Sequence, residues 1–203
     1  MNININNHSS IQIDNIFVDP YAISNPTKTA KYILITHTHY DHLSIEDIEK
    51  IVQDDTIFIS TADAEMTLKE HFPNHTIVVV EPNQKMRFFD FKLETFPAYN
   101  IHKEFHKKIY GWVGYKITKS GTTYAVLGDT DATPELEQLK CDVLFVPIGG
   151  TYTMNAHEAA MLTNKIQPKL VVPTHYNLIV GTKTDEAEFL KNLDKNIKYQ
   201  ILI

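Results

Sequence analysis

The sequence contains a single cysteine, Cys141, so it cannot form an intramolecular disulfide. Cys141 begins the apolar run at residues 141–146, where a free thiol is usually a buried structural side chain. Residues 1–6 alternate polar and apolar side chains and lack the basic start and continuous apolar stretch of a signal peptide. We therefore expect a protein of the reducing cytoplasm.

Long apolar runs and an excess of positive charge are also absent. No window approaches the roughly 18 apolar residues of a membrane span, so we expect no membrane partner. The chain carries 19 Lys and Arg against 25 Asp and Glu, which leaves no general basic field to hold a polyanion. We expect a small-molecule substrate and no nucleic-acid partner, and the sequence allows a homo-oligomer.

The sequence does contain enough apolar material for one sizeable core. Hydrophobic residues make up 43% of the 203 residues, and there is no internal repeat, low-complexity segment or Gly/Ser-rich linker. We therefore predict a single domain over residues 1–203.

The apolar periodicity predicts two halves, each of which begins with strands and then alternates strands with helices. Helices are predicted after Ser44, near residues 186–193, and at 62–71, 133–139 and 156–166, with a hairpin turn at Ser120-Gly121. Strands are predicted at residues 3–5, 11–13, 16–18, 32–35, 56–60, 77–80, 86–89, 91–96, 112–118, 123–127, 143–146, 170–172 and 199–203. This order suggests two sheets packed face to face with helices outside, an α/β sandwich.

Residues 37–42 carry the strongest chemical signal, because they place three imidazoles and one carboxylate within six positions after an apolar strand. Neutral imidazole and carboxylate are preferred ligands of zinc and similar ions, whereas such density is rare on a solvated surface loop. Asp129 and His175 also follow apolar strands, although alone they could be a turn aspartate and a core histidine. Because ligands collect outside strand ends in layered α/β folds, we expect these three segments to meet at one metal site.

The pattern H-x-H-x-D-H, a distant G-D-T and a distant histidine after an apolar strand resemble the metallo-β-lactamase superfamily. Residues 7–10 and the Asp19-Pro20 pair resemble the start of its branch that contains ascorbate-6-phosphate lactonase-like and N-acyl-phospholipid phosphodiesterase-like hydrolases. The match covers essentially the whole chain. This resemblance implies a four-layer αββα sandwich with a dinuclear metal site at one edge between the sheets.

Carried over to this sequence, the resemblance implies two divalent metal ions, expected to be zinc, with manganese or iron as alternatives. The implied ligands are His37 and His39 for the first metal, Asp41, His42 and His175 for the second, and Asp129 as a bridge between both. Asp41 is also expected to hold or orient the nucleophile.

Two further residues are expected close to the ligands. His8 is expected beside the metals, in contact with substrate or with a carboxylate, unless it merely closes the first hairpin. Asp19 is expected to buttress the loop at residues 37–42, unless it is a simple turn residue before Pro20.

One ligand departs from the family pattern. The third histidine of the first metal is expected after the strand at residues 91–96, where this sequence has Tyr99 and Asn100. Asn100 could act as a weak carbonyl ligand or lie beside the substrate, His102 or His106 could fold back to fill the position, or the first metal could bind weakly. We favour His106.

The expected function is a metal-dependent hydrolase. Two metals that share a carboxylate lower the pKa of a bridging water from about 15.7 towards 7, which supplies hydroxide for attack on a carbonyl or phosphorus. A small-molecule ester, lactone, amide or phosphodiester satisfies this scheme. The alternatives are a phosphodiesterase or nuclease, and a metal-binding module without turnover, which the missing third histidine leaves open. A redox di-iron protein is disfavoured, because the glutamate and flavin domain typical of such relatives are not seen.

Overall fold

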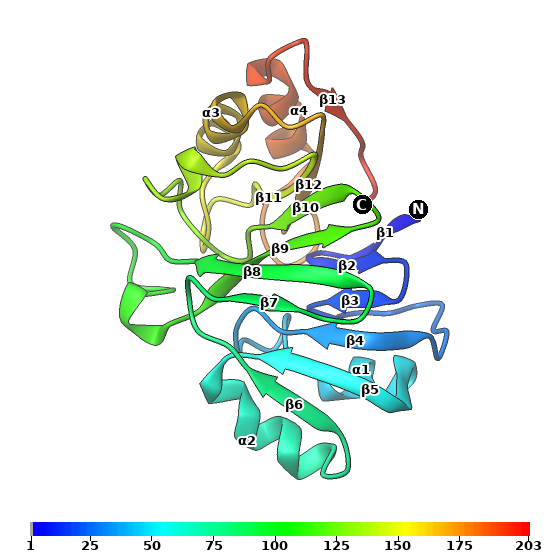
Figure 1. Cartoon of the computed structure of the whole chain (residues 1–203). Helices are drawn as coiled ribbons and strands as arrows, with labels where there is room; N and C mark the ends of the chain where they lie inside the picture. The colour runs from blue at the N-terminus through cyan, green and yellow to red at the C-terminus, as the bar shows by residue number, and fades with distance from the viewer. Residues whose placement is uncertain (1) are drawn as a thin grey trace. The chain divides into compact units, whose positions relative to one another are not determined.

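The computed structural model describes residues 2–203, which divide into two compact units, residues 2–81 with Ile203 and residues 82–202. Each unit contains one sheet, with the first in blue to cyan and the second from green onward (Figure 1). The single domain over residues 1–203 stays a prediction. Within residues 2–203, no helix has the length and apolar character needed to cross a membrane.

The first unit is built on a six-stranded sheet with the order β1-β2-β3-β4-β5-β6. Its strands are β1 (Ile3–Asn7), β2 (Ser10–Ile13), β3 (Ile16–Val18), β4 (Ala30–Leu34), β5 (Val52–Ser60) and β6 (Thr76–Val79). Strands β1 to β3 pair antiparallel, and β3 to β6 pair parallel. Because β1, β3 and β4 therefore run in one direction, the residues that follow them emerge at the same edge of the sheet.

Helices α1 (Ile45–Ile51) and α2 (Ala62–His71) pack on one face of this sheet. Phe17, Ile33 and Phe58 are register partners on β3, β4 and β5, so their side chains share that face. They form one buried cluster with Ile48 of α1 and Leu68 of α2. Each such buried side chain contributes roughly 1.5–3 kcal/mol to folding, which fixes both helices against the sheet.

Helix α1 begins where the sequence predicts it, at Ser44, whose Oγ accepts a hydrogen bond from the backbone N–H of Asp47. The Asp47 carboxylate accepts hydrogen bonds from the backbone N–H groups of Ala22 and Ile23 and from Lys50 Nζ, each at 2.9 Å. Burial raises the pKa of Asp47, but these hydrogen bonds outweigh burial and hold the pKa below its ordinary value. The carboxylate thus ties α1 to the segment after β3.

The second unit is built on a seven-stranded sheet with the order β13-β12-β11-β10-β9-β8-β7. Its strands are β7 (Lys85–Arg87), β8 (Phe91–Pro97), β9 (Val113–Lys119), β10 (Thr122–Val126), β11 (Val143–Pro147), β12 (Leu170–Thr174) and β13 (Lys198–Tyr199). Strands β7 to β10 pair antiparallel and β10 to β13 pair parallel. Strands β8, β10, β11 and β12 therefore share a direction, and the loops that follow them leave from one edge.

Helices α3 (Ala156–Ile166) and α4 (Lys183–Asn192) of the second unit lie side by side (Figure 1). Helix α3 begins with a capping box. Glu158 N–H donates to Asn155 Oδ1 at 2.9 Å, and Asn155 N–H donates to Glu158 Oε2 at 2.9 Å. The predicted bounds of α3 are confirmed, and this capping box stabilises its start.

Some predicted elements are wrong in extent. Strand β5 begins at Val52, four residues before its predicted start. The helix predicted at residues 133–139 is only a short 3₁₀ turn, η2 (Leu136–Gln138), because Glu135 supplies no side-chain cap and Leu139 is extended. Another 3₁₀ turn, η1, lies at Lys108–Tyr110. The strand predicted at residues 199–203 ends at Tyr199. Gln200 N–H still donates to Val171 O at 3.0 Å, but the next bond of the ladder would need an N–H from Pro173, which has none.

Cys141 is partly exposed rather than fully buried. Burial still raises the pKa of its thiol to about 12, so that it stays protonated at neutral pH. A structural rather than a reactive thiol is therefore the appropriate description.

We predict that Asp47→Asn lowers the free energy of unfolding at pH 7 by about 1–3 kcal/mol, because hydrogen bonds to a charged carboxylate are lost. Since folding lowers the pKa of Asp47, its stabilising contribution is present above about pH 4 and is lost as the pH falls through the folded pKa. Urea denaturation should therefore show a smaller difference between variant and wild type at pH 2.5 than at pH 7. Asp55→Asn, at an exposed carboxylate on β5, is the control and should change little.

Candidate metal centre

In the first unit, the loop after β4 brings three histidines together. His37 Nε2 lies 3.1 Å from His39 Nδ1, and the ring centroids of His37 and His42 are 4.0 Å apart. The chain turns sharply here because the N–H groups of His42 and Leu43 both donate to His39 O, at 2.9 and 2.8 Å. His37, Asp41 and His42 are buried.

His8, in the hairpin between β1 and β2, reaches the same loop. Its Nε2 lies 3.3 Å from Asp41 Oδ2, and His42 Nε2 lies 3.4 Å from the same oxygen. The His8 side chain is fully buried. His8 therefore contacts a carboxylate of the cluster, in addition to closing the first hairpin.

Asp19, which follows β3, contacts the cluster through Nδ1 of His42. Its Oδ2 lies 2.7 Å from His42 Nδ1, and its Oδ1 accepts a hydrogen bond from Thr36 N–H at 2.8 Å. Burial raises the pKa of Asp19, and the contacts with His42 and Thr36 oppose that rise. The contact fixes the imidazole so that Nε2, the other ring nitrogen, faces Asp41.

Sequence reasoning missed Thr36. Its hydroxyl donates to Asp19 Oδ2 at 2.6 Å and lies 3.0 Å from His37 Nδ1, so it joins a carboxylate to an imidazole of the cluster. The available signal was its place directly before His37 at the end of an apolar strand, where a buried hydroxyl needs a partner.

In the second unit, Asp129, His106 and His175 come together from three different loops. Asp129 Oδ2 lies 3.0 Å from His175 Nε2 and 3.3 Å from His106 Nε2. All three residues are buried, whereas His102 is exposed. Of the three residues that the sequence leaves open, His106 is the one whose ring faces Asp129.

Asn100 is also buried, but its amide group is engaged by its own loops. Its Nδ2 donates to Tyr152 O at 2.7 Å and to Phe105 O at 3.1 Å. The side chain therefore ties the loop after β8 to the loop after β11.

The backbone is left-handed at four of these residues. The φ angles are 50° at His8, 48° at Asp19, 55° at His106 and 55° at His175. Residues other than glycine rarely adopt this conformation, and where they do they cluster at functional sites. The loop after β11 also requires Gly149, because a Cβ there would lie 2.2 Å from His175 O.

Both clusters fit a divalent metal by their donor chemistry. Each contains buried imidazoles with a carboxylate oxygen at 3.0–3.4 Å from their Nε2 atoms. Zinc binds imidazole nitrogen and carboxylate oxygen at about 2.0–2.2 Å, which places neighbouring ligands of a tetrahedral ion about 3.3 Å apart. The distances of His42, His106 and His175 from their carboxylate partners are therefore compatible with ligands that share a metal.

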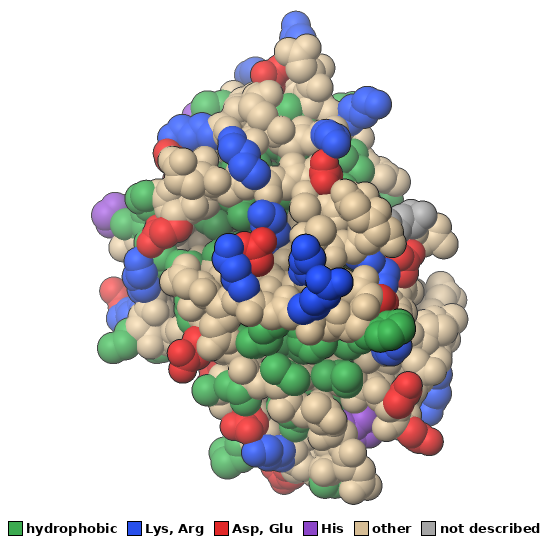
Figure 2. Space-filling view, viewed as in Figure 1, with side chains coloured by type: hydrophobic (Ala, Val, Ile, Leu, Met, Phe, Trp, Pro, Cys, Tyr) green, Lys and Arg blue, Asp and Glu red, His purple; other side chains and the backbone are tan. Residues whose placement is uncertain are grey.

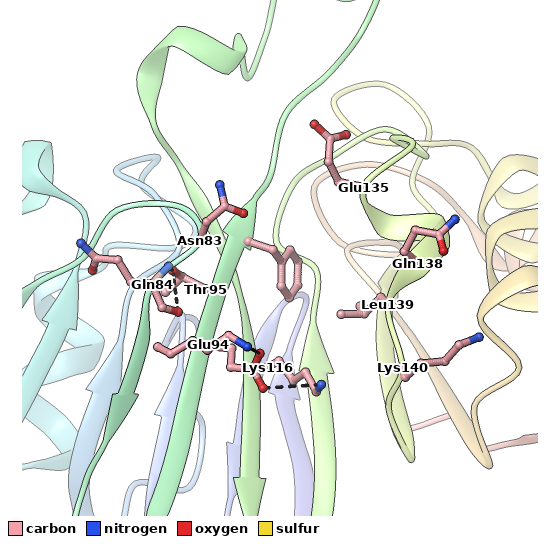
Figure 3. Close-up of a pocket in the computed structure, with 11 residues that line it drawn as sticks. Asn83, Gln84, Glu94, Thr95, Lys116, Glu135, Gln138, Leu139 and Lys140 are labelled. Carbon is pink, nitrogen blue, oxygen red and sulfur yellow. Dashed lines mark hydrogen bonds and ion pairs between the residues drawn. The ribbon is translucent and has the colours of Figure 1, made fainter.

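A cavity of about 360 Å³ in the second unit lies elsewhere (Figure 3). It contains none of the candidate ligands, and its Glu94 carboxylate lies 3.2 Å from Lys85 and 3.6 Å from Lys116. Over β8 and β9, Figure 2 shows mainly Lys and Arg side chains with an acidic side chain among them. This cavity is therefore separate from the candidate metal ligands.

Comparison with known proteins identifies the family. The profile of the beta-lactamase superfamily domain matches residues 3–175, which include all of the candidate metal ligands. The chain belongs to the metallo-β-lactamase superfamily. A UPF0173 metal-dependent hydrolase from Natranaerobius thermophilus is 30% identical to it, over 97% of this chain and 92% of the relative.

Solved structures share the fold of this chain. A protein from Parabacteroides distasonis, proposed to be a metal-dependent hydrolase, has a TM-score of 0.84 at 29% identity and covers 98% of this chain and 91% of its own. The metallo hydrolase Igni18 from Ignicoccus hospitalis shares the fold, with a TM-score of 0.76 at 21% identity over 98% and 93% of the two chains. The predicted α/β sandwich of the metallo-β-lactamase fold is confirmed.

We predict that His42 in the metal-free protein at pH 8 carries its proton on Nδ1, because Asp19 accepts from that atom. In Asp19→Asn, the amide that replaces Oδ2 would donate to Nδ1 and move the proton to Nε2. Imidazole ¹⁵N chemical shifts measure this change. Asp14→Asn, at a hairpin turn of the same unit, should leave the shifts unchanged, and an unaltered tautomer in Asp19→Asn would contradict the assignment.

Proposed function

We propose that this chain is a metal-dependent hydrolase of a small-molecule ester, lactone or phosphodiester, and that the two clusters form one dinuclear centre. The main support is the buried set of imidazoles around a carboxylate in each unit. The full-length similarity to a relative named as a metal-dependent hydrolase supports it further. The lactonase-like and phosphodiesterase-like branch, suggested by residues 7–10 and Asp19-Pro20, is part of the proposal.

The ligands are assigned by the positions of the family motif. The first metal is bound by His37, His39 and His106, the second by Asp41, His42 and His175, with Asp129 as the bridge. We propose zinc for both positions, with manganese or iron as alternatives, because the donors are nitrogen and carboxylate oxygen without thiolate. For the third ligand of the first metal, the sequence left Asn100, His102 and His106 open, and we assign His106.

The residues of this chain then have distinct tasks. When bound, the metals would supply Lewis acidity and a hydroxide nucleophile at neutral pH. Asp41 would hold or orient that nucleophile, and His8 Nε2, 3.3 Å from Asp41 Oδ2, would hold the carboxylate in place. Asp19 and Thr36 keep His42 and His37 in fixed orientations. Their burial strengthens each of these interactions, because water does not screen them.

A small substrate fits this chain better than a polynucleotide. The net charge of −6 provides no general basic field for a phosphate backbone. The alternative of a metal-binding module without turnover rested on the missing third histidine. It is disfavoured if His106 supplies that ligand. The cytoplasmic location and a homo-oligomeric state remain predictions.

We predict that the purified protein carries close to two divalent ions per chain, because the seven assigned ligands exceed what one ion needs. Elemental analysis should give this stoichiometry. A screen of lactone, ester, thioester and phosphodiester substrates should reveal hydrolysis that a chelator abolishes and added zinc restores. Purified protein without bound metal, together with hydrolysis that survives chelation, would contradict the proposal.

We predict that Asp129→Ala abolishes hydrolysis and lowers the metal content, because a bridging carboxylate positions both ions. His8→Ala should retain two ions and lose about 10–100-fold in activity, since it acts through Asp41. His102→Ala, at an exposed position on the loop of His106, is the control and should behave as wild type. Equal losses of kcat with full metal content in Asp129→Ala and His8→Ala would argue against these roles.

A further inference from the structure

The loop that carries His106 takes an unusual path. In the family pattern the third histidine of the first metal is expected near residue 100, yet the ring beside Asp129 comes from a residue six positions later. The chain must return on itself to achieve this. Asn100 N–H donates to His106 O at 2.8 Å, so the two residues lie together at the base of the loop.

The Asn100 side chain closes this loop with further contacts. Its Nδ2 donates to Phe105 O at 3.1 Å and to Tyr152 O at 2.7 Å, and it lies 3.4 Å from His106 Nδ1. Tyr152 is in the loop after β11, and its ring meets the Phe105 ring at right angles, with centroids 4.7 Å apart. Because Asn100 is only 5% exposed, water cannot readily replace these hydrogen bonds.

The residues on either side of Asn100 are attached to the segment that carries Asp129. Thr130 Oγ1 accepts a hydrogen bond from Tyr99 N–H at 3.1 Å and lies 2.9 Å from Tyr99 O. Asp131 Oδ2 accepts a hydrogen bond from Ile101 N–H at 2.9 Å. The base of the loop is therefore fixed relative to the bridging carboxylate, and the Asn100 side chain fixes the returning end.

We propose that Asn100 is a positioning residue that clamps residues 100–106, so that His106 presents Nε2 to the first metal in place of the family's earlier histidine. This inference rests on the proposed function, in which His106 is a ligand. Two carbonyl oxygens must be satisfied by one side chain, and a primary amide supplies the two N–H groups that this requires. An aspartate of the same shape has none and would face both carbonyls with negative charge.

The same geometry defines the competing role of Asn100. Its Oδ1 is buried and makes no hydrogen bond among residues 2–203, so direct ligation through this oxygen is the alternative. The two roles depend on opposite ends of one amide. Asn100→Asp keeps an oxygen ligand and removes the clamp, whereas Asn100→Ser keeps a single donor.

The test measures zinc affinity by competition with a chromophoric chelator, together with amide hydrogen exchange of the loop, in the full-length protein. Asn100→Asp should weaken zinc at one of the two positions by about 10-fold or more, leave the other unchanged, and speed exchange across residues 101–106. Asn100→Ser should fall between wild type and Asn100→Asp. His102→Ala is the matched control on the same loop, and circular dichroism checks that each variant is folded.

Three results would separate the possible failures. Zinc affinity in Asn100→Asp that equals or exceeds wild type would overturn the clamp and identify Oδ1 as a ligand. Unchanged zinc affinity in His106→Ala would instead overturn the assignment of His106 as a ligand. Absence of zinc binding by the wild-type protein would overturn the proposed function itself.

Discussion

The positions of the candidate ligands depend on the direction of the strands that precede them. In the first unit β1, β3 and β4 run the same way, and the residues that follow them include His8, Asp19 and His37. In the second unit β8, β10 and β12 run the same way and deliver the loops of His106, Asp129 and His175. A strand held by a ladder has little freedom at its end, so each ligand enters its loop at a fixed place. Reversal of any one strand would carry its ligand to the opposite edge of the sheet.

Burial gives these clusters their chemical character. Asp19, Asp41 and Asp129 are three carboxylates with almost no exposure, and each faces at least one imidazole. A buried carboxylate is costly unless a positive charge or hydrogen-bond donor faces it. A bound cation at such a cluster satisfies imidazole and carboxylate together, and for this reason metal binding and folding stability are expected to be coupled in this chain.

Apolar periodicity and caps were enough to predict most elements from the sequence. Helices α2 and α3 have the predicted bounds, and α3 begins at a capping box that is visible in the sequence. The end of the final strand could not be predicted, since it depends on Pro173 in a neighbouring strand. Among the site residues, the dense motif at residues 37–42 and the strand-end positions of Asp129 and His175 were visible in the sequence.

Other parts of the site depend on contacts that one sequence does not reveal. The Asn100 side chain is held by a hydrogen bond to the backbone of Tyr152, 52 positions away in the sequence. Thr36 was missed because a threonine at the end of a strand is ordinary. In each case the sequence shows which residue is present, but its role depends on contacts with residues that are distant in the sequence.

The left-handed backbone at His8, Asp19, His106 and His175 has a consequence for how the fold can change over generations. At each of the three histidines this conformation costs on the order of 1 kcal/mol relative to an ordinary one, and glycine or asparagine would remove much of that cost. A descendant released from the need for a metal would therefore gain folding stability by replacing these histidines. Substitutions that remove the metal ligands would therefore increase folding stability, and the histidines persist only while selection for their function continues.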